Sequence, residues 1–264
     1  MSVLAVTRLE LRRLVVRPLA WVLAALSVAQ LAGRFMLLLQ IFIANQIRLA
    51  AQPGGPGYTD LVGVPMLSSI LTSGILPMLP FGLAELALVV VPLLTMSSLA
   101  GERSQGTLPL WFAAGLPAWR IVLGKYLALM LWLTLWLAIT LAMPLSLAHG
   151  ITLDWGKLAS ATLGLWLMLA ALAAIGIACS SFASHPAIAA TTSLMLGLAL
   201  VSVNVGAMMA GVNNGFFNWL SMNAHLDSMI RGLVSSADVV WFLLVVAVAL
   251  ALAAQRLAAE RERG

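Results

Sequence analysis

Long, nearly uninterrupted blocks of apolar residues run through this 264-residue chain, and they restrict its fold more than any other feature. About 20 consecutive apolar residues are needed to cross a ~30 Å hydrocarbon core as a helix. Because lipid offers the backbone no hydrogen-bond partners, each block is expected to be helical. Charged residues make up only 9% of the chain, against roughly 25% in ordinary soluble proteins. A soluble helical bundle is a poor competitor, and the sequence predicts an all-α polytopic membrane protein.

The order of apolar and polar segments predicts an amphipathic helix followed by six transmembrane helices. Residues 1–18 mix apolar and basic positions over Val3–Arg17, a pattern typical of an elbow helix that lies in the membrane interface. The expected spans are Leu19–Ala44, Gly74–Leu99, Trp119–Ala148, Lys157–Phe182, Ala187–Gly211 and Val239–Ala254. Residues 45–73 are expected to form a Gly/Pro-rich loop with a short helix, and the less apolar residues 212–238 precede the last span.

The positions of the basic residues predict the orientation of the chain. If there are six spans, ten cations share one side of the membrane: Arg8, Arg12, Arg13, Arg17, Arg103, Arg120, Lys125, Arg256, Arg261 and Arg263. Only Arg48, Lys157 and Arg231 fall on the other side. Because Lys and Arg are retained on the cytoplasmic side, both termini are predicted to be cytoplasmic and residues 212–238 extracytoplasmic. Arg120 and Lys125 are expected to anchor the third span at the interface.

This distribution of charge also argues against a nucleic-acid partner, although the net charge is +5. The cations sit at the ends of apolar blocks rather than in one stripe, as membrane orientation requires. We therefore expect the lipid bilayer to be the partner of these cations, and the protein to lie in the cytoplasmic (inner) membrane as a multi-pass chain.

No motif for nucleotide binding or hydrolytic chemistry occurs in the sequence. It lacks a Gly-x-x-x-x-Gly-Lys-Ser/Thr loop, a His-Glu-x-x-His zinc motif and a Gly-x-Ser-x-Gly elbow. We therefore predict no catalytic residue, metal site or cofactor in this chain. If the protein uses ATP, another subunit binds it.

The connection between the second and third spans carries the most specific pattern. A short polar turn, Gly101–Gly106, leads into an apolar stretch, Thr107–Leu116, which is too short to span a membrane and is ended by Pro117. We expect a short cytoplasmic helix capped by Thr107. Its apolar side chains are available to lie against lipid or to enter a groove on a partner: Leu108, Leu110, Trp111 and Phe112.

This connection resembles the coupling region of the ABC type-2 permease family. The matching residues are Glu102, Arg103, Gly106, Thr107, Leu108, Pro117, Gly124 and Lys125. The resemblance implies one permease domain over residues 1–264, in which residues 101–118, with Leu110 and Trp111, dock on a separate cytoplasmic ABC ATPase that carries ATP and Mg. It also implies a homodimer or heterodimer of permease chains.

Three positions depart from the family's pattern: Ser97, Gly101 and Pro109. Either the docking surface is unusual, or this chain is a divergent partner in a heteromeric complex.

Residues 223–238 resemble the His-containing extracytoplasmic segment of the gliding-motility permease subfamily, which points toward export or cell-envelope processes. The residues of this motif are His225, Asp227, Arg231, Gly232 and Asp238. A His–carboxylate pair can hold a metal or move protons, but a capping or loop-ordering role is favoured here. The segment is a candidate contact for an extracytoplasmic accessory protein.

Arg34 and Glu85 are expected inside the first and second spans, at broadly similar depth in the outer half of the membrane. Because unpaired charges are costly there, an ion pair between them is favoured. A substrate or interface role and snorkelling of Arg34 are the alternatives.

The favoured function is that of the permease subunit of an ABC transporter, most like an exporter. Two alternatives stay open. An ion-driven secondary transporter is weakened because Glu85 is the only acidic residue firmly inside a span. A non-transporting membrane scaffold of an envelope complex is the second.

Overall fold

The computed structural model describes residues 2–50, 55–68, 81–148, 150–209, 211 and 215–263. Within these ranges six helical segments are long and apolar enough to cross a membrane: Pro18–Gln46, Leu83–Ser104, Ala118–Leu145, Trp155–Phe182, Pro186–Met209 and Ser236–Glu262. No strand occurs in the described part of the chain. The predicted all-α architecture with six candidate transmembrane helices is therefore confirmed.

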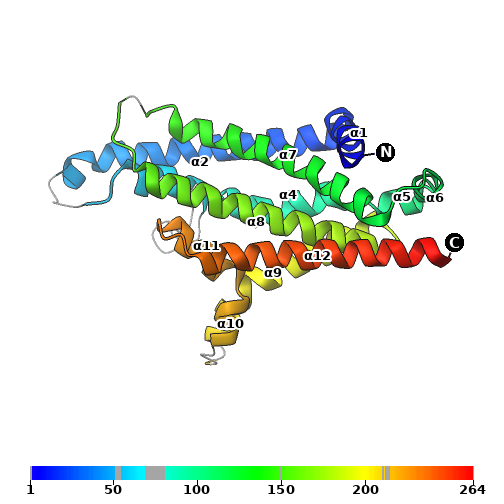
Figure 1. The fold of residues 1–264 in the computed structure, drawn as a ribbon. Helices are drawn as coiled ribbons and strands as arrows, with labels where there is room; N and C mark the ends of the chain where they lie inside the picture. Colours follow the sequence, from blue (N-terminus) through cyan, green and yellow to red (C-terminus); the bar gives the residue numbers. More distant parts are fainter. Residues whose placement is uncertain are drawn as a thin grey trace.

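The long helices run side by side as one elongated bundle (Figure 1). They are α2 (Pro18–Ala50), α4 (Leu83–Thr95), α7 (Ala118–Leu145), α8 (Trp155–Phe182), α9 (Pro186–Met209) and α12 (Ser236–Arg263). Both chain ends lie at the same end of the bundle, which we call the terminal end (Figure 1). The short helices α1 (Val3–Val16), α5 (Ala100–Ser104) and α6 (Leu108–Ala113) gather there.

The opposite end, which we call the far end, carries the other short helices. The chain returns there through a short π-helical turn, η1 (Thr59–Gly63), and α3 (Val64–Leu67). Helix α11 (Met222–Ile230) also lies toward this end, and α10 (Gly215–Leu220) projects away from the bundle (Figure 1).

Helix α8 forms the centre of the bundle. In its most apolar 18-residue stretch 72% is buried, compared with 17% in the corresponding stretch of α9. Small residues on α8 allow neighbouring helices to approach closely. At Gly176 an added Cβ would lie 2.2 Å from Oγ1 of Thr95 on α4, so that any larger residue would push the two helices apart. The arrangement leaves α2 and α9 with broad exposed faces.

Helix α1 packs against the start of α7 at the terminal end. Val6 and Thr7 are its buried residues, and Val6 faces Gly124, where an added Cβ would lie 2.6 Å from Cγ1 of Val6. In Figure 1 α1 is seen almost end-on, so it runs across the direction of the long helices. The glycine at position 124 thus allows the crossing helix to lie directly on α7.

The connection after the first span contains the expected short helix, as η1 and α3, but it packs into the bundle more than a loop would. Helix α2 continues to Ala50, and the chain then folds back so that Tyr58, Met66 and Leu67 are buried. The hydroxyl of Tyr58 donates a hydrogen bond to the backbone oxygen of Pro144 at 3.0 Å. Apolar and aromatic residues within this polar-looking segment thus become part of the bundle. Residues 51–54 and 69–73 lie outside the described residues.

Two predicted span boundaries also change. Helix α4 begins at Leu83 rather than at Gly74, and residues 74–80 lie outside the described residues. Helix α12 continues beyond Ala254 through the charged tail to Arg263. The tail stays helical against the bundle because Leu257 is buried and Glu260 pairs with Arg103.

Candidate functional site at the terminal end

The segment that joins α4 to α7 at the terminal end contains two short helices set at an angle to the long ones. We call residues 101–118 the α5–α6 connection. Gly106 and Gly115 follow the two helices with φ of 68° and 70°, in the left-handed region that glycine adopts without steric cost. Pro117 then stands at the N-cap of α7.

Thr107 occupies the N-cap position of α6, but its side chain makes no capping hydrogen bond. Its hydroxyl donates instead to the backbone oxygen of Glu102 at 3.3 Å. The predicted capping role of Thr107 is therefore wrong. The hydroxyl closes the turn between α5 and α6 rather than accepting from the free N–H groups of α6.

Four charged side chains from three helices form a cluster beside this turn, which we call the charge quartet: Glu10, Arg13, Glu102 and Lys125. Lys125 and Glu102 are buried, whereas Arg13 is 44% exposed. Lys125 Nζ donates to Oε1 of Glu102 and to Oε1 of Glu10, both at 2.9 Å. Arg13 Nη1 donates to the same two oxygens, at 2.9 Å from Glu102 and 3.0 Å from Glu10. Two cations and two anions thus alternate, which is the compensation that charges removed from water require.

Lys125 occupies a different place from the interfacial anchor expected from its position near the start of α7. Its side chain is only 2% exposed and points into the charge quartet. Arg120, by contrast, stays half-exposed and stacks on the ring of Trp119, with Cζ 5.2 Å from the ring centroid.

Helix α6 covers the charge quartet with one aromatic side chain. The ring of Trp111 lies 5.8 Å from Cζ of Arg13 and 5.4 Å from Nζ of Lys125, within cation–π range. Leu108 is buried, whereas Leu110 is 69% exposed. Four side chains were expected to face lipid or a partner. Leu108 is buried, Trp111 and Phe112 are partly buried against the core, and Leu110 points outward.

Arg103, the neighbour of Glu102, bonds to the other side of the bundle. Its Nε and Nη2 donate to the two carboxylate oxygens of Glu260 on α12, at 2.9 and 2.5 Å. Nη2 also donates to the backbone oxygen of Ser181 at 2.8 Å, and Nη1 donates to that of Ala183. The two parallel hydrogen bonds to Glu260 fix both the position and the orientation of the Arg103 guanidinium relative to α12.

The start of α5 is held from α8 as well. Oγ of Ser180 accepts hydrogen bonds from the backbone N–H groups of Leu99 and Ala100, both at 3.0 Å. It donates to the backbone oxygen of Met96 at 3.2 Å. The turn between α4 and α5 is thus bonded to the end of the most buried helix.

Sequence reasoning singled out Glu102 and Arg103 but missed their partners. Arg13 lies 89 residues from Glu102, and Glu260 lies 157 residues from Arg103. Ser180, which binds the start of α5, lies 80 residues from Ala100. The one available signal was that Glu10 is the sole acidic residue among the basic positions of the first helix.

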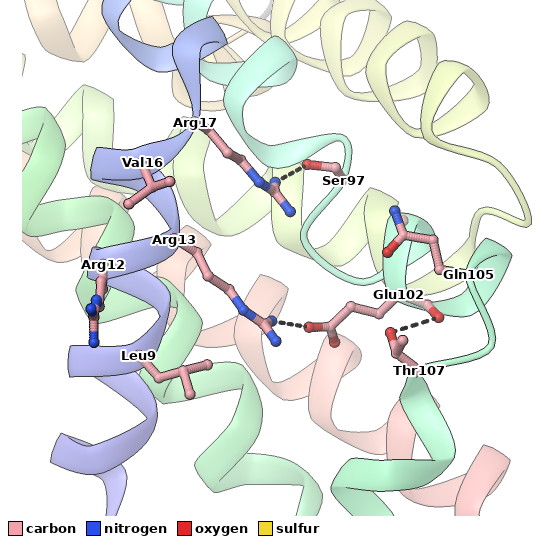
Figure 2. Close-up of a pocket in the computed structure, with 10 residues that line it drawn as sticks. Leu9, Arg12, Arg13, Val16, Arg17, Ser97, Glu102, Gln105 and Thr107 are labelled. Carbon is pink, nitrogen blue, oxygen red and sulfur yellow. Dashed lines mark hydrogen bonds and ion pairs between the residues drawn. The ribbon is translucent and has the colours of Figure 1, made fainter.

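An open cleft of about 530 Å³ lies between α1 and the start of the α5–α6 connection (Figure 2). Its lining residues are Leu9, Arg12, Arg13, Val16, Arg17, Ser97, Gly101, Glu102, Gln105 and Thr107. Arg17 Nη1 donates to Oγ of Ser97 at 2.7 Å across this cleft. We call it the elbow cleft.

At the far end, His225 of α11 is held between two acceptors. Its Nδ1 lies 2.7 Å from Oδ1 of Asp238, and its Nε2 lies 3.0 Å from the backbone oxygen of Trp219. Its ring stacks on Trp241, with centroids 4.7 Å apart. Ser228 Oγ donates to the second oxygen of Asp238 at 2.6 Å. The His225 ring thus joins α10, α11 and α12.

The other residues of this motif lie around α11. Arg231 Nε donates to Asp227 at 2.9 Å, within one exposed helical turn. Gly232 has φ of 93° and lies against the stem of Lys157. The carboxylate that pairs with His225 is thus Asp238, whereas Asp227 pairs with Arg231.

Arg34 is fully buried within α2 near the far end. Its Nε and Nη2 donate to the backbone oxygen of Pro65 at 3.0 and 2.7 Å. The carboxylate of Glu85 also interacts electrostatically with this guanidinium. Pro65 was not foreseen as a partner, because residues 45–73 were expected to form a loop.

The family described as ABC-2 family transporter protein matches residues 50–254 of the chain. A search of curated proteins finds no match.

Proposed function

The chain belongs to the ABC-2 transporter family, with the membrane helices of its permease subunits, and from this premise we propose that it is an export permease driven by a separate cytoplasmic ATPase. The family's transmembrane subunit is not itself catalytic, and family membership implies an ATPase partner and a dimeric arrangement in general. Export, the compartment of each end and the identity of the ATPase belong to the proposal.

One observation carries the coupling role: adjacent residues of the α5–α6 connection bond to opposite sides of the bundle. Glu102 bonds to α1 and α7 through the charge quartet, and Arg103 bonds to α12 and to the α8–α9 turn. A displacement of α6 is therefore transmitted to several helices at once, since both contacts are charged and partly or fully buried. This is the mechanical property that coupling to an ATPase requires.

The outward face of α6 supports docking at this place. Leu110 is a large apolar side chain that no other part of the described chain covers. A short helix with an exposed apolar residue suits insertion into a groove on a partner. We propose that the terminal end is cytoplasmic, because the connection and both chain ends carry most of the chain's cations.

The exposed faces of α2 and α9 support a dimer. In the most apolar 18-residue stretch of each helix, only 28% is buried in α2 and 17% in α9. Their exposed residues include Gln40, Thr191 and Ser202. Polar side chains gain more from another helix or from water than from lipid. We propose that these faces meet the second permease chain, a copy of this one or a related protein, and line the pathway.

The residues joined by His225 are proposed to form an ordered extracytoplasmic element. The resemblance to the gliding-motility permeases and the contacts among α10, α11 and α12 support this role. The element is also the proposed contact for an accessory protein outside the cytoplasm.

The docking proposal is tested by replacing Leu110 with Asp and purifying the tagged permease from native membranes. We expect an ATPase with a phosphate-loop motif to co-purify with the unaltered chain and to be lost with Leu110→Asp. Leu233→Asp is the matched control, since Leu233 is 68% exposed but lies at the far end. Equal recovery of the ATPase with both variants would refute docking through α6.

A further inference from the structure

The elbow cleft has a surplus of positive charge that its own residues do not balance. Within the charge quartet, Arg13 is compensated by Glu10 and Glu102. Arg17 bonds to a neutral hydroxyl, and among the described residues no carboxylate lies within ion-pair distance of Arg12 or Arg17. Two guanidinium groups at the cleft are therefore available to an anion.

The spacing along α1 places Arg12 beside an apolar strip, and Arg17 follows directly after the helix. Leu9, Arg12 and Val16 follow the spacing of a single helical face, and all three line the cleft together with Arg17. In Figure 2 the side chain of Arg17 reaches toward the α4–α5 turn, while that of Arg12 lies along α1 on the side away from this turn. Leu9 and Val16 are exposed beside them.

The opposite wall of the elbow cleft supplies neutral polar groups. Ser97 and Thr107 contribute hydroxyls and Gln105 contributes an amide. Guanidinium forks together with neutral donors are the set of groups that binds a phosphate. The volume of about 530 Å³ falls within the range of ligand sites in proteins.

We propose that the elbow cleft binds the headgroup of an anionic phospholipid, with Arg12 and Arg17 as its cationic contacts. A lipid rather than a soluble phosphate is indicated by the surroundings, because exposed Val15, Val16 and Trp21 continue from the cleft onto the start of the first span. Basic clusters beside a transmembrane helix are typical of anionic-lipid recognition. This inference is independent of the docking role of α6.

The site is tested with the purified full-length chain in detergent, by native mass spectrometry during titration with phosphatidylglycerol. Charge-assisted hydrogen bonds contribute enough that the double variant R12Q/R17Q should bind this lipid roughly tenfold or more weakly than the unaltered chain. The control R8Q/R120Q removes the same charge from two residues of the terminal end that do not line the cleft. It should keep the affinity within about twofold, because neither arginine lines the cleft.

Three outcomes would overturn the proposal. Equal loss in both double variants would show general attraction of the lipid to surface charge. If phosphatidylcholine binds as tightly as phosphatidylglycerol, the cleft does not require a net anionic headgroup. If inorganic phosphate binds as tightly as phosphatidylglycerol, the assignment of a lipid is refuted. If R12Q/R17Q does not elute as a folded protein, the single variant R12Q carries the test, since Arg12 is exposed and makes no hydrogen bond or ion pair among the described residues.

Discussion

Replacing Lys125 with Met removes one charge from the middle of the quartet while keeping a side chain of similar length. Lys125 Nζ lies 2.9 Å from a carboxylate oxygen of Glu10 and 2.9 Å from one of Glu102. Without it, the two carboxylates share only Arg13, and the net charge of the quartet changes from zero to −1. Since the lysine side chain is 2% exposed, water cannot take over its role.

The expected loss is large because breaking a buried ion pair from one side costs about 3–5 kcal/mol. At about 2–4 °C per kcal/mol, this corresponds to a fall of roughly 6–20 °C in the midpoint of thermal unfolding. The measurement is the melting curve of the purified protein in one detergent at one pH. Lys157→Met is the control, because Lys157 and its partner Asp60 are 30% and 36% exposed. An ion pair this exposed contributes only about 0–1 kcal/mol.

A second variant separates the charge effect from simple loss of packing. Adding Glu102→Gln to Lys125→Met returns the quartet to neutrality, so the double variant should recover roughly half or more of the lost stability. If Lys125→Met and Lys157→Met shift the midpoint equally, or if the double variant is less stable than the single one, the assignment of a buried, mutually compensated quartet is refuted.

Two further predictions concern helix packing and coupling. Gly176→Ala places a Cβ 2.2 Å from Oγ1 of Thr95, so it should lower the free energy of unfolding by about 1–3 kcal/mol. The control Gly33→Ala places a Cβ that meets nothing within 4 Å and should leave stability unchanged. Equal melting points for the two variants would contradict the packing argument. Arg103→Lys keeps the charge but loses the two-pronged contact with Glu260. It should leave recovery of the ATPase unchanged while lowering the ATPase rate of the complex roughly tenfold or more, and an unaltered rate would refute transmission through this arginine.

The spans were predictable because hydropathy is a local property and lipid requires each apolar block to satisfy its own backbone hydrogen bonds. The sequence also indicated the α5–α6 connection, since a polar turn, a short apolar stretch and Pro117 lie next to one another in the chain. The resemblance built on that connection agrees with the family match. None of this required knowledge of which helices touch.

The faces of the helices were not predictable in the same way. In a membrane span, side chains that meet lipid and side chains that meet protein are equally apolar, so the sequence carries little periodicity to separate them. Helices α8 and α9 read alike in the sequence, yet one is the core and the other is mostly exposed. For the same reason the sequence did not predict that, on α6, Leu108 faces inward and Leu110 faces outward.

The sequence by itself thus determined the membrane class, the number of spans and the two charged residues of the connection. Only the tertiary structure decided what those charges do. It brings Glu10, Arg13 and Lys125 to Glu102, and it brings Glu260 to Arg103 across a separation of 157 residues. The physical reason is that an ion pair depends on distance in space, and the packing of α1, α7 and α12 around the terminal end sets those distances.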